Sequence, residues 1–71
     1  MDKDEGERLA KAIARTRVAW LEVRGIERNP ITGEYELNCL YRHEKGLAPW
    51  TELRIRSPRQ WIDLLTSRGA I

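Results

Sequence analysis

Apolar residues recur at helical spacing near the start of the chain. Four positions follow the i, i+3, i+4, i+7 pattern of one helix face: Leu9, Ala12, Ile13 and Thr16. Asp4 stands where it can cap such a helix, and the glutamates that follow it suit the positive end of the helix dipole. The pattern predicts a helix over residues 4–16, with residues 1–4 frayed.

The end of this first helix has two interpretations. Its apolar stripe continues as far as Val23, so a longer helix to about residue 24 would give the order α-β-β-α. The other interpretation starts a strand near Val18. It is favoured by residues 29–33, Asn-Pro-Ile-Thr-Gly, which are typical of a turn between two strands.

Pairing two strands around this turn separates apolar from polar side chains. One face then holds the mostly apolar pairs Leu21–Tyr41, Val23–Cys39, Gly25–Leu37 and Glu27–Tyr35. The other face holds the pairs Trp20–Arg42, Glu22–Leu40, Arg24–Asn38, Ile26–Glu36 and Arg28–Glu34. A one-residue slip would mix the two faces, so the separation favours this register, with Trp20 and Arg42 as a cation–π pair.

The last third of the chain predicts a strand followed by a helix. Residues 50–56 alternate in polarity, with Leu53 and Ile55 on the apolar side. Ser57 and Pro58 are the residue types preferred at the cap and first position of a helix. The buried stripe of this helix and its end are assigned to Trp61, Leu64, Leu65 and Gly69.

Together these elements predict an α+β fold. It is a three-stranded antiparallel meander with helices packed on one face, in the order α-β-β-β-α, and residues 44–49 form the loop before the last strand. Residues 1–71 make a single small domain. The predicted core is Leu9, Ile13, Leu21, Val23, Leu37, Cys39, Tyr41, Leu53, Ile55, Trp61, Leu64 and Leu65.

Composition narrows the class of protein. Apolar residues make up 41% and charged residues 34% of the chain, with a net charge of +2, which is typical of a globular domain. No apolar run reaches the ~18 residues of a transmembrane helix, and no secretory signal is visible, so we expect a cytoplasmic protein without membrane contact. A single Cys forms no internal disulfide, and one Cys with one His makes no four-ligand zinc site.

The residues that could carry chemistry have simpler interpretations. Cys39 and His43 are about 13 Å apart along a strand, too far to share one metal, and Cys39 lies on the predicted core face. The carboxylates on the outer sheet face, Glu22, Glu36 and Glu52, are each expected to have an arginine neighbour. We therefore expect no enzyme, no cofactor, no metal and no small-molecule substrate.

The outer sheet face is the candidate binding surface, because tryptophan and arginine are enriched at interaction hot spots. Its residues are Trp20, Arg24, Arg42, Trp50, Arg54 and Arg56. The glutamates on the same face would repel phosphate, which favours a protein partner over nucleic acid. The sequence thus predicts an accessory or regulatory binding module that docks a protein through this face or through a free strand edge, with a homodimer as one form of edge pairing.

The alternative is a nucleic-acid-binding domain that uses Arg24, Arg42, Arg54 and Arg56 with Trp20 and Trp50. The predicted α-β-β-β-α order is similar to that of double-stranded-RNA-binding domains. Those domains begin their last helix with several lysines, whereas residues 57–61 here, Ser-Pro-Arg-Gln-Trp, contain one arginine. The resemblance is one of element order, so no functional residue is carried over from it.

Overall fold

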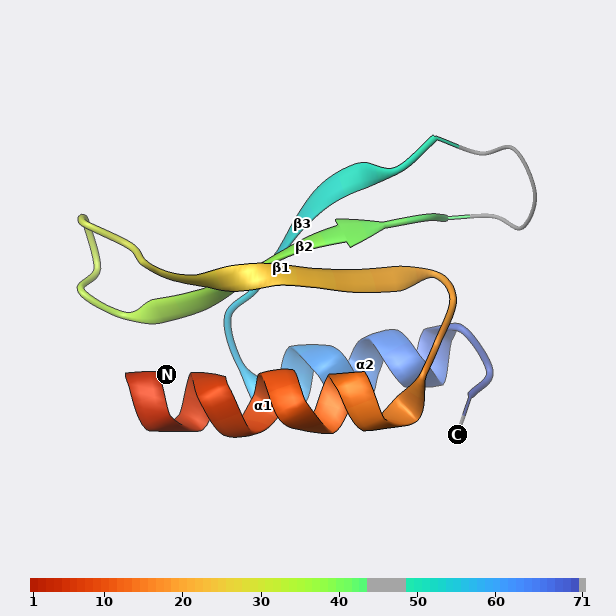
Figure 1. The fold of residues 1–71 in the computed structure, drawn as a ribbon, viewed down its shortest axis with the longest axis horizontal. Coiled ribbons are helices and arrows are strands. Elements are labelled where there is room, and N and C mark those ends of the chain that lie inside the picture. Colours follow the sequence, from red (N-terminus) through yellow and green to blue (C-terminus); the bar gives the residue numbers. More distant parts are fainter. Residues whose placement is uncertain (44–48, 71) are drawn as a thin grey trace.

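The chain folds into two helices and one antiparallel sheet, as seen in a computed structural model that describes residues 1–43 and 49–70. The elements are α1 (Lys3–Thr16), β1 (Leu21–Arg28), β2 (Tyr35–Tyr41), β3 (Thr51–Ile55) and α2 (Pro58–Ser67). The strands follow the order β1-β2-β3, and both helices lie on the same face of the sheet (Figure 1). This confirms the predicted α-β-β-β-α fold, and the longer first helix is wrong. Most of the predicted loop, residues 44–48, lies outside the described residues.

The cap of helix α1 lies two residues earlier than predicted. Asp2 is the N-cap, because its carboxylate accepts a hydrogen bond of 2.7 Å from the Glu5 amide, and Asp4 lies inside the helix. The first residue, for which we expected fraying, is bonded to the sheet. The carbonyl of Met1 accepts a 2.9 Å hydrogen bond from the amide of Tyr35 at the start of β2. The cap and this bond place α1 beneath the first two strands.

The hairpin turn between β1 and β2 forms where the sequence predicts it. The side-chain oxygen of Asn29 accepts hydrogen bonds from the amides of Ile31 and Thr32, at 2.9 and 3.3 Å. Gly33 has a φ of +76°, a conformation that favours glycine. The turn thus follows from the chemistry of its own residues.

A β-bulge in β1 corrects the predicted pairing. The register is as expected from Leu21↔Tyr41 to Val23↔Cys39, and it shifts between Val23 and Gly25, so that Arg24 has no residue opposite it. Beyond the bulge Ile26 faces Leu37, and Arg28 faces Tyr35 instead of Glu34. The extra residue turns Ile26 toward the helices, where it lies against the backbone of Gly6, and turns Glu27 to the outer face. Burial of Ile26 is the physical reason for the shift.

Helix α2 follows the sequence prediction closely. Ser57 caps it by accepting a 3.2 Å hydrogen bond from the Gln60 amide, and Pro58 is its first residue. At the other end Gly69 has a φ of +72° and its amide donates to Thr66, while the Ala70 amide donates to the carbonyl of Leu65. These two bonds form a Schellman motif, which satisfies carbonyls at the end of the helix.

The core lies between the two helices and the inner face of the sheet. Its buried apolar residues are Leu9, Ile13, Leu21, Leu37, Cys39, Tyr41, Ile55 and Trp61, all of them predicted. The remaining predicted members, Val23, Leu53, Leu64 and Leu65, are half-buried and pack against this cluster. In the described part of the chain, no helix has the length and apolar character needed to cross a membrane.

Two isoleucine variants test this packing. Ile55 is fully buried, so Ile55→Ala should lower the free energy of unfolding by about 2–5 kcal/mol. Ile62, on α2, is 47% exposed, and Ile62→Ala should change the free energy of unfolding by less than about 0.5 kcal/mol. Urea denaturation of both variants measures the difference. Equal effects would contradict the assignment of the inner face.

Candidate functional site

The sheet face that points away from the helices is the candidate functional site and is called the open face below. No helix of the described residues covers this side of the sheet in Figure 1. Strand alternation places on it Glu22, Arg24 and Glu27 of β1, Glu36, Asn38 and Leu40 of β2, and Glu52 and Arg54 of β3, with Arg56 just beyond. Most of these side chains are charged, so the open face is a mixed-charge surface.

Ion pairs connect the three strands across the open face. The Nη1 atom of Arg54 lies 2.7 Å from a carboxylate oxygen of Glu27 and 4.0 Å from one of Glu36. The side-chain amide of Asn38 donates a 3.2 Å hydrogen bond to the second carboxylate oxygen of Glu27. Because these partners come from β1, β2 and β3, the network holds the strands in one arrangement.

Glu36 is the buried member of this network. Its side chain is only 6% exposed, and one of its oxygens lies 3.3 Å from the Nε of Arg56. The same oxygen accepts a 3.2 Å hydrogen bond from the side-chain amide of Asn29 in the hairpin turn. A buried carboxylate is costly unless it is bonded in this way. Glu36 therefore joins the turn, the middle of the sheet and the segment that leads into α2.

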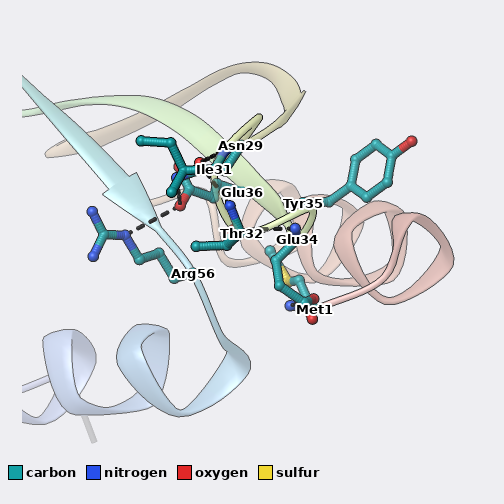
Figure 2. Close-up of a pocket in the computed structure, with 8 residues that line it drawn as sticks. All are labelled: Met1, Asn29, Ile31, Thr32, Glu34, Tyr35, Glu36 and Arg56. Atoms are coloured by element: carbon teal, nitrogen blue, oxygen red, sulfur yellow. Dashed lines mark hydrogen bonds and ion pairs between the residues drawn. The ribbon is translucent and has the colours of Figure 1, made fainter.

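A pocket of about 380 Å³ lies beside Glu36, between the hairpin turn, the start of β2 and Met1 (Figure 2). Its charged groups are matched with one another. The Met1 amino group lies 2.8 Å from Glu34, and Arg56 is paired with Glu36. The ion pairs at this pocket therefore join the N-terminus and the segment after β3 to the start of β2.

Trp20 is the main correction among the predicted site residues. Its ring lies on the helix side, with ring centroids 6.0 Å from Tyr41 and 5.8 Å from Trp61, and the guanidinium of Arg68 covers it at 4.6 Å. The expected Trp20–Arg42 cation–π pair is thus wrong. The chain passes Trp20 before β1 begins at Leu21, so the strand alternation that predicted an outer position does not apply there.

Arg42 packs instead on Trp50. Its guanidinium lies 4.3 Å from the centroid of the Trp50 ring, with Arg42 just after β2 and Trp50 just before β3. Trp50 is 36% exposed, and Arg42 is half-buried. This pair forms the aromatic end of the open face.

The other predicted site residues lie where the sequence places them, on the open face. Arg24 is 3.8 Å from Glu22 and borders a shallow hollow with Asn38, Leu40 and Glu52. Arg54 and Arg56 are the partners of Glu27 and Glu36. Sequence reasoning missed Glu27, because the bulge that brings it to this face leaves no clear signal in the sequence.

A second missed residue is Gln60 in the first turn of α2. Its side-chain oxygen accepts a 2.9 Å hydrogen bond from the Arg56 amide, and its side-chain nitrogen donates a 2.9 Å hydrogen bond to the carbonyl of Arg54. Both backbone groups belong to the outer edge at the end of β3. The Gln60 amide thus bonds to this edge as the peptide group of a neighbouring strand would.

Cys39 and His43 lie in different environments, one buried and one exposed. Cys39 is fully buried, and burial raises the pKa of its thiol to about 11, so it stays protonated as the predicted core residue. His43 is exposed and packs its ring edge against Tyr41 at 4.7 Å between centroids. Within residues 1–43 and 49–70, no three His, Cys, Asp or Glu side chains are grouped so as to hold a metal ion.

Removal of the Gln60 side chain tests its place at the β3 edge. Gln60→Ala should lower the free energy of unfolding by about 1 kcal/mol, the net contribution of one or two part-exposed hydrogen bonds. The amide of Arg56 should also exchange faster with deuterium, because it loses its acceptor. Unchanged exchange at Arg56 would show that water replaces the side chain without loss.

The Glu27–Arg54 pair makes a prediction about pH. The hydrogen bond and charge of Arg54 hold the pKa of Glu27 below its ordinary value. The pair therefore stabilises the fold above the unfolded-state pKa, and this contribution is lost as the pH falls through the lower, folded-state pKa. In an NMR titration, Arg54→Ala should return the pKa of Glu27 toward its ordinary value, while Arg59→Ala, which removes a charge on α2, should leave it in place. No change in Arg54→Ala would contradict the pairing.

No protein-family model, no curated protein and no solved structure matches this chain. The function proposed next therefore rests on the geometry and charge of the open face.

Proposed function

We propose that this chain is a small non-catalytic binding module, an accessory or regulatory protein that docks a protein partner through its open face. The observation that carries the proposal is the open face itself, a sheet surface without a covering helix whose charges are balanced across three strands. Balanced, fixed charges suit recognition of a surface with a complementary pattern, since they reject partners whose charges are misplaced.

The balance of charges favours a protein over a nucleic acid. The carboxylates of the described open face and its aromatic end are Glu22, Glu27, Glu36 and Glu52, and the guanidiniums are Arg24, Arg42, Arg54 and Arg56. Affinity for nucleic acid comes largely from cations that neutralise phosphates. Here most of the arginines already lie against carboxylates, so phosphate binding would have to break those pairs.

The Arg42–Trp50 pair is the proposed anchor of the interface. Tryptophan and arginine contribute most where they are fully desolvated at the centre of a contact. The stacking of Arg42 on Trp50 fixes both side chains before the partner arrives, which reduces the entropy lost on binding. Leu40, half-buried on the adjoining part of the open face, extends the apolar contact area.

Nucleic-acid binding is the alternative proposal, with Arg24, Arg42, Arg54 and Arg56 as phosphate contacts and Trp20 and Trp50 as stacking platforms. The position of Trp20 counts against it, because its ring packs on Trp61 beneath Arg68. We propose no catalytic role and no cofactor. The protonated, buried thiol of Cys39 suits a reducing compartment, and we propose the cytoplasm.

Site-specific photocrosslinking in living cells tests the docking proposal. A photoreactive amino acid at Glu52 lies on the open face, and the same amino acid at Ile62 lies on α2 as a control. The Glu52 position should give a discrete protein adduct that Trp50→Ala abolishes, and the Ile62 position should not give that adduct. Adducts of equal yield from both positions would contradict docking through the open face.

An NMR titration separates the two classes of partner. Labelled protein is mixed with a random-sequence duplex and with a single-stranded oligonucleotide at low and moderate salt. We expect no shifts on the open face. Shifts at Arg24, Arg42, Arg54 and Arg56 that fade as salt rises would overturn the protein proposal in favour of nucleic-acid binding.

A further inference from the structure

The two outer edges of the sheet are treated differently. The edge of β3 belongs to a five-residue strand, and Gln60 occupies its end by bonding to Arg54 and Arg56. The edge of β1 belongs to an eight-residue strand, and no hydrogen bond from another described residue reaches it. A long unpaired edge is a template for another strand. Intermolecular pairing is therefore directed to β1.

Two hydrogen bonds identify which backbone groups point outward from β1. The Arg42 amide donates to the carbonyl of Trp20, and the Asn29 amide donates to that of Glu34, so both ends of the ladder between β1 and β2 are fixed. In an antiparallel pair, every second residue of a strand directs its N–H and C=O groups away from the partner strand. Applied from each end of the ladder as far as the bulge, this alternation leaves four residues of β1 whose N–H and C=O groups face away from β2. These residues are Leu21, Val23, Ile26 and Arg28.

We propose that β1 pairs antiparallel with β1 of a second copy of this chain, which makes one continuous six-stranded sheet. In the register with Val23 opposite Ile26 of the second copy, Leu21 lies opposite Arg28, and all four outward residues form hydrogen-bonded pairs. Val23 and Ile26 also lie on the helix side in both copies, so each pair buries apolar surface. This proposal is independent of docking through the open face.

The bulge is compatible with this pairing. A bulge in an edge strand usually interrupts pairing with another chain. In the proposed register the twofold axis passes between Arg24 and Gly25, so the two bulges lie opposite each other. The ladder on each side of the axis then keeps matching residues, with the apolar side chains of both strands on the helix side. This argues for a second copy as the occupant.

On the open face, this register depends on Arg24. Arg24 of each copy lies opposite Gly25 of the other, which has no side chain and leaves room. Its diagonal neighbour across the pair is Glu27, within reach of a long side chain. Glu22 lies opposite Glu27 of the second copy, a like-charge pair that is unfavourable unless the two Arg24 side chains between these carboxylates offset it. Arg24 is the side chain on which the charge complementarity depends.

Helix α1 leaves space for the second copy. It packs against both β1 and β2, so its axis lies beneath the outer part of the sheet. With strands ~4.8 Å apart, the two α1 helices of the dimer would lie about 10 Å apart, a normal distance for packed helices. A row of small residues, Gly6, Ala10 and Ala14, starts beneath Ile26 at the edge strand and recurs every four positions. No bulky side chain of this row obstructs the approach.

Sedimentation velocity over a concentration series tests the proposal on the full chain. The wild-type chain should form a reversible dimer. Arg24→Glu should weaken the dimer by about tenfold or more, because it places like charges beside Glu27. Arg24 has one exposed ion pair, with Glu22, so the folded monomer should persist, as circular dichroism can verify. Arg8→Glu, the same charge change at an exposed residue of α1, is the matched control and should leave the dimer unchanged.

Hydrogen exchange measured at low and high protein concentration locates the contact. The amides of Val23 and Ile26 should exchange more slowly at high concentration, and those of Glu52 and Arg54 on the β3 edge should not change. A monomer at every concentration, or a dimer that Arg24→Glu leaves intact, would overturn the proposal. Protection at β3 instead of β1 would overturn the choice of edge. Trp50→Ala should not affect the dimer, which separates this test from that of the open face.

Discussion

The structure depends on burial of one face of β2, the central strand. Leu37 and Cys39 of β2 and Ile55 of β3 are fully buried in the core between the sheet and the two helices. A chain of 71 residues has enough apolar side chains to cover one face of a three-stranded sheet, and small domains bury a limited share of their surface. The second face must then be stable in contact with water, which explains why it is built from paired charges and amides.

The ion pairs and hydrogen bonds of the open face also fix how neighbouring segments are arranged. Glu36 is buried among Asn29, Arg54 and Arg56, which belong to the hairpin turn, to β3 and to the segment before α2. A buried carboxylate with these partners specifies one arrangement of the segments, because any other would leave the charge uncompensated. The position of Glu36 on the open face is consequently fixed by partners from three segments, which reduces the entropy that this side chain would lose on docking.

The sequence predicts what depends on local chemistry and alternation. The turn at Asn29, the cap at Ser57 and the buried core follow from residue types and spacing that act within a few positions. The bulge at Arg24 could not be predicted, because it is decided by contact between Ile26 and α1. Trp20 was misplaced for a related reason, since its ring packs with Trp61 from the other end of the chain. The role of Gln60 likewise depends on where α2 docks.

The hydrogen bonds of Gln60 link the exposure of the β3 edge to the stability of the first turn of α2. A side chain from the first turn of a helix occupies the end of the β3 edge, so this end is closed only while that turn is formed. Helix ends open locally far more often than whole domains unfold. The exposure of this end to other chains therefore follows the fraying equilibrium of α2, and solution conditions that loosen helix ends would expose it well below the unfolding transition.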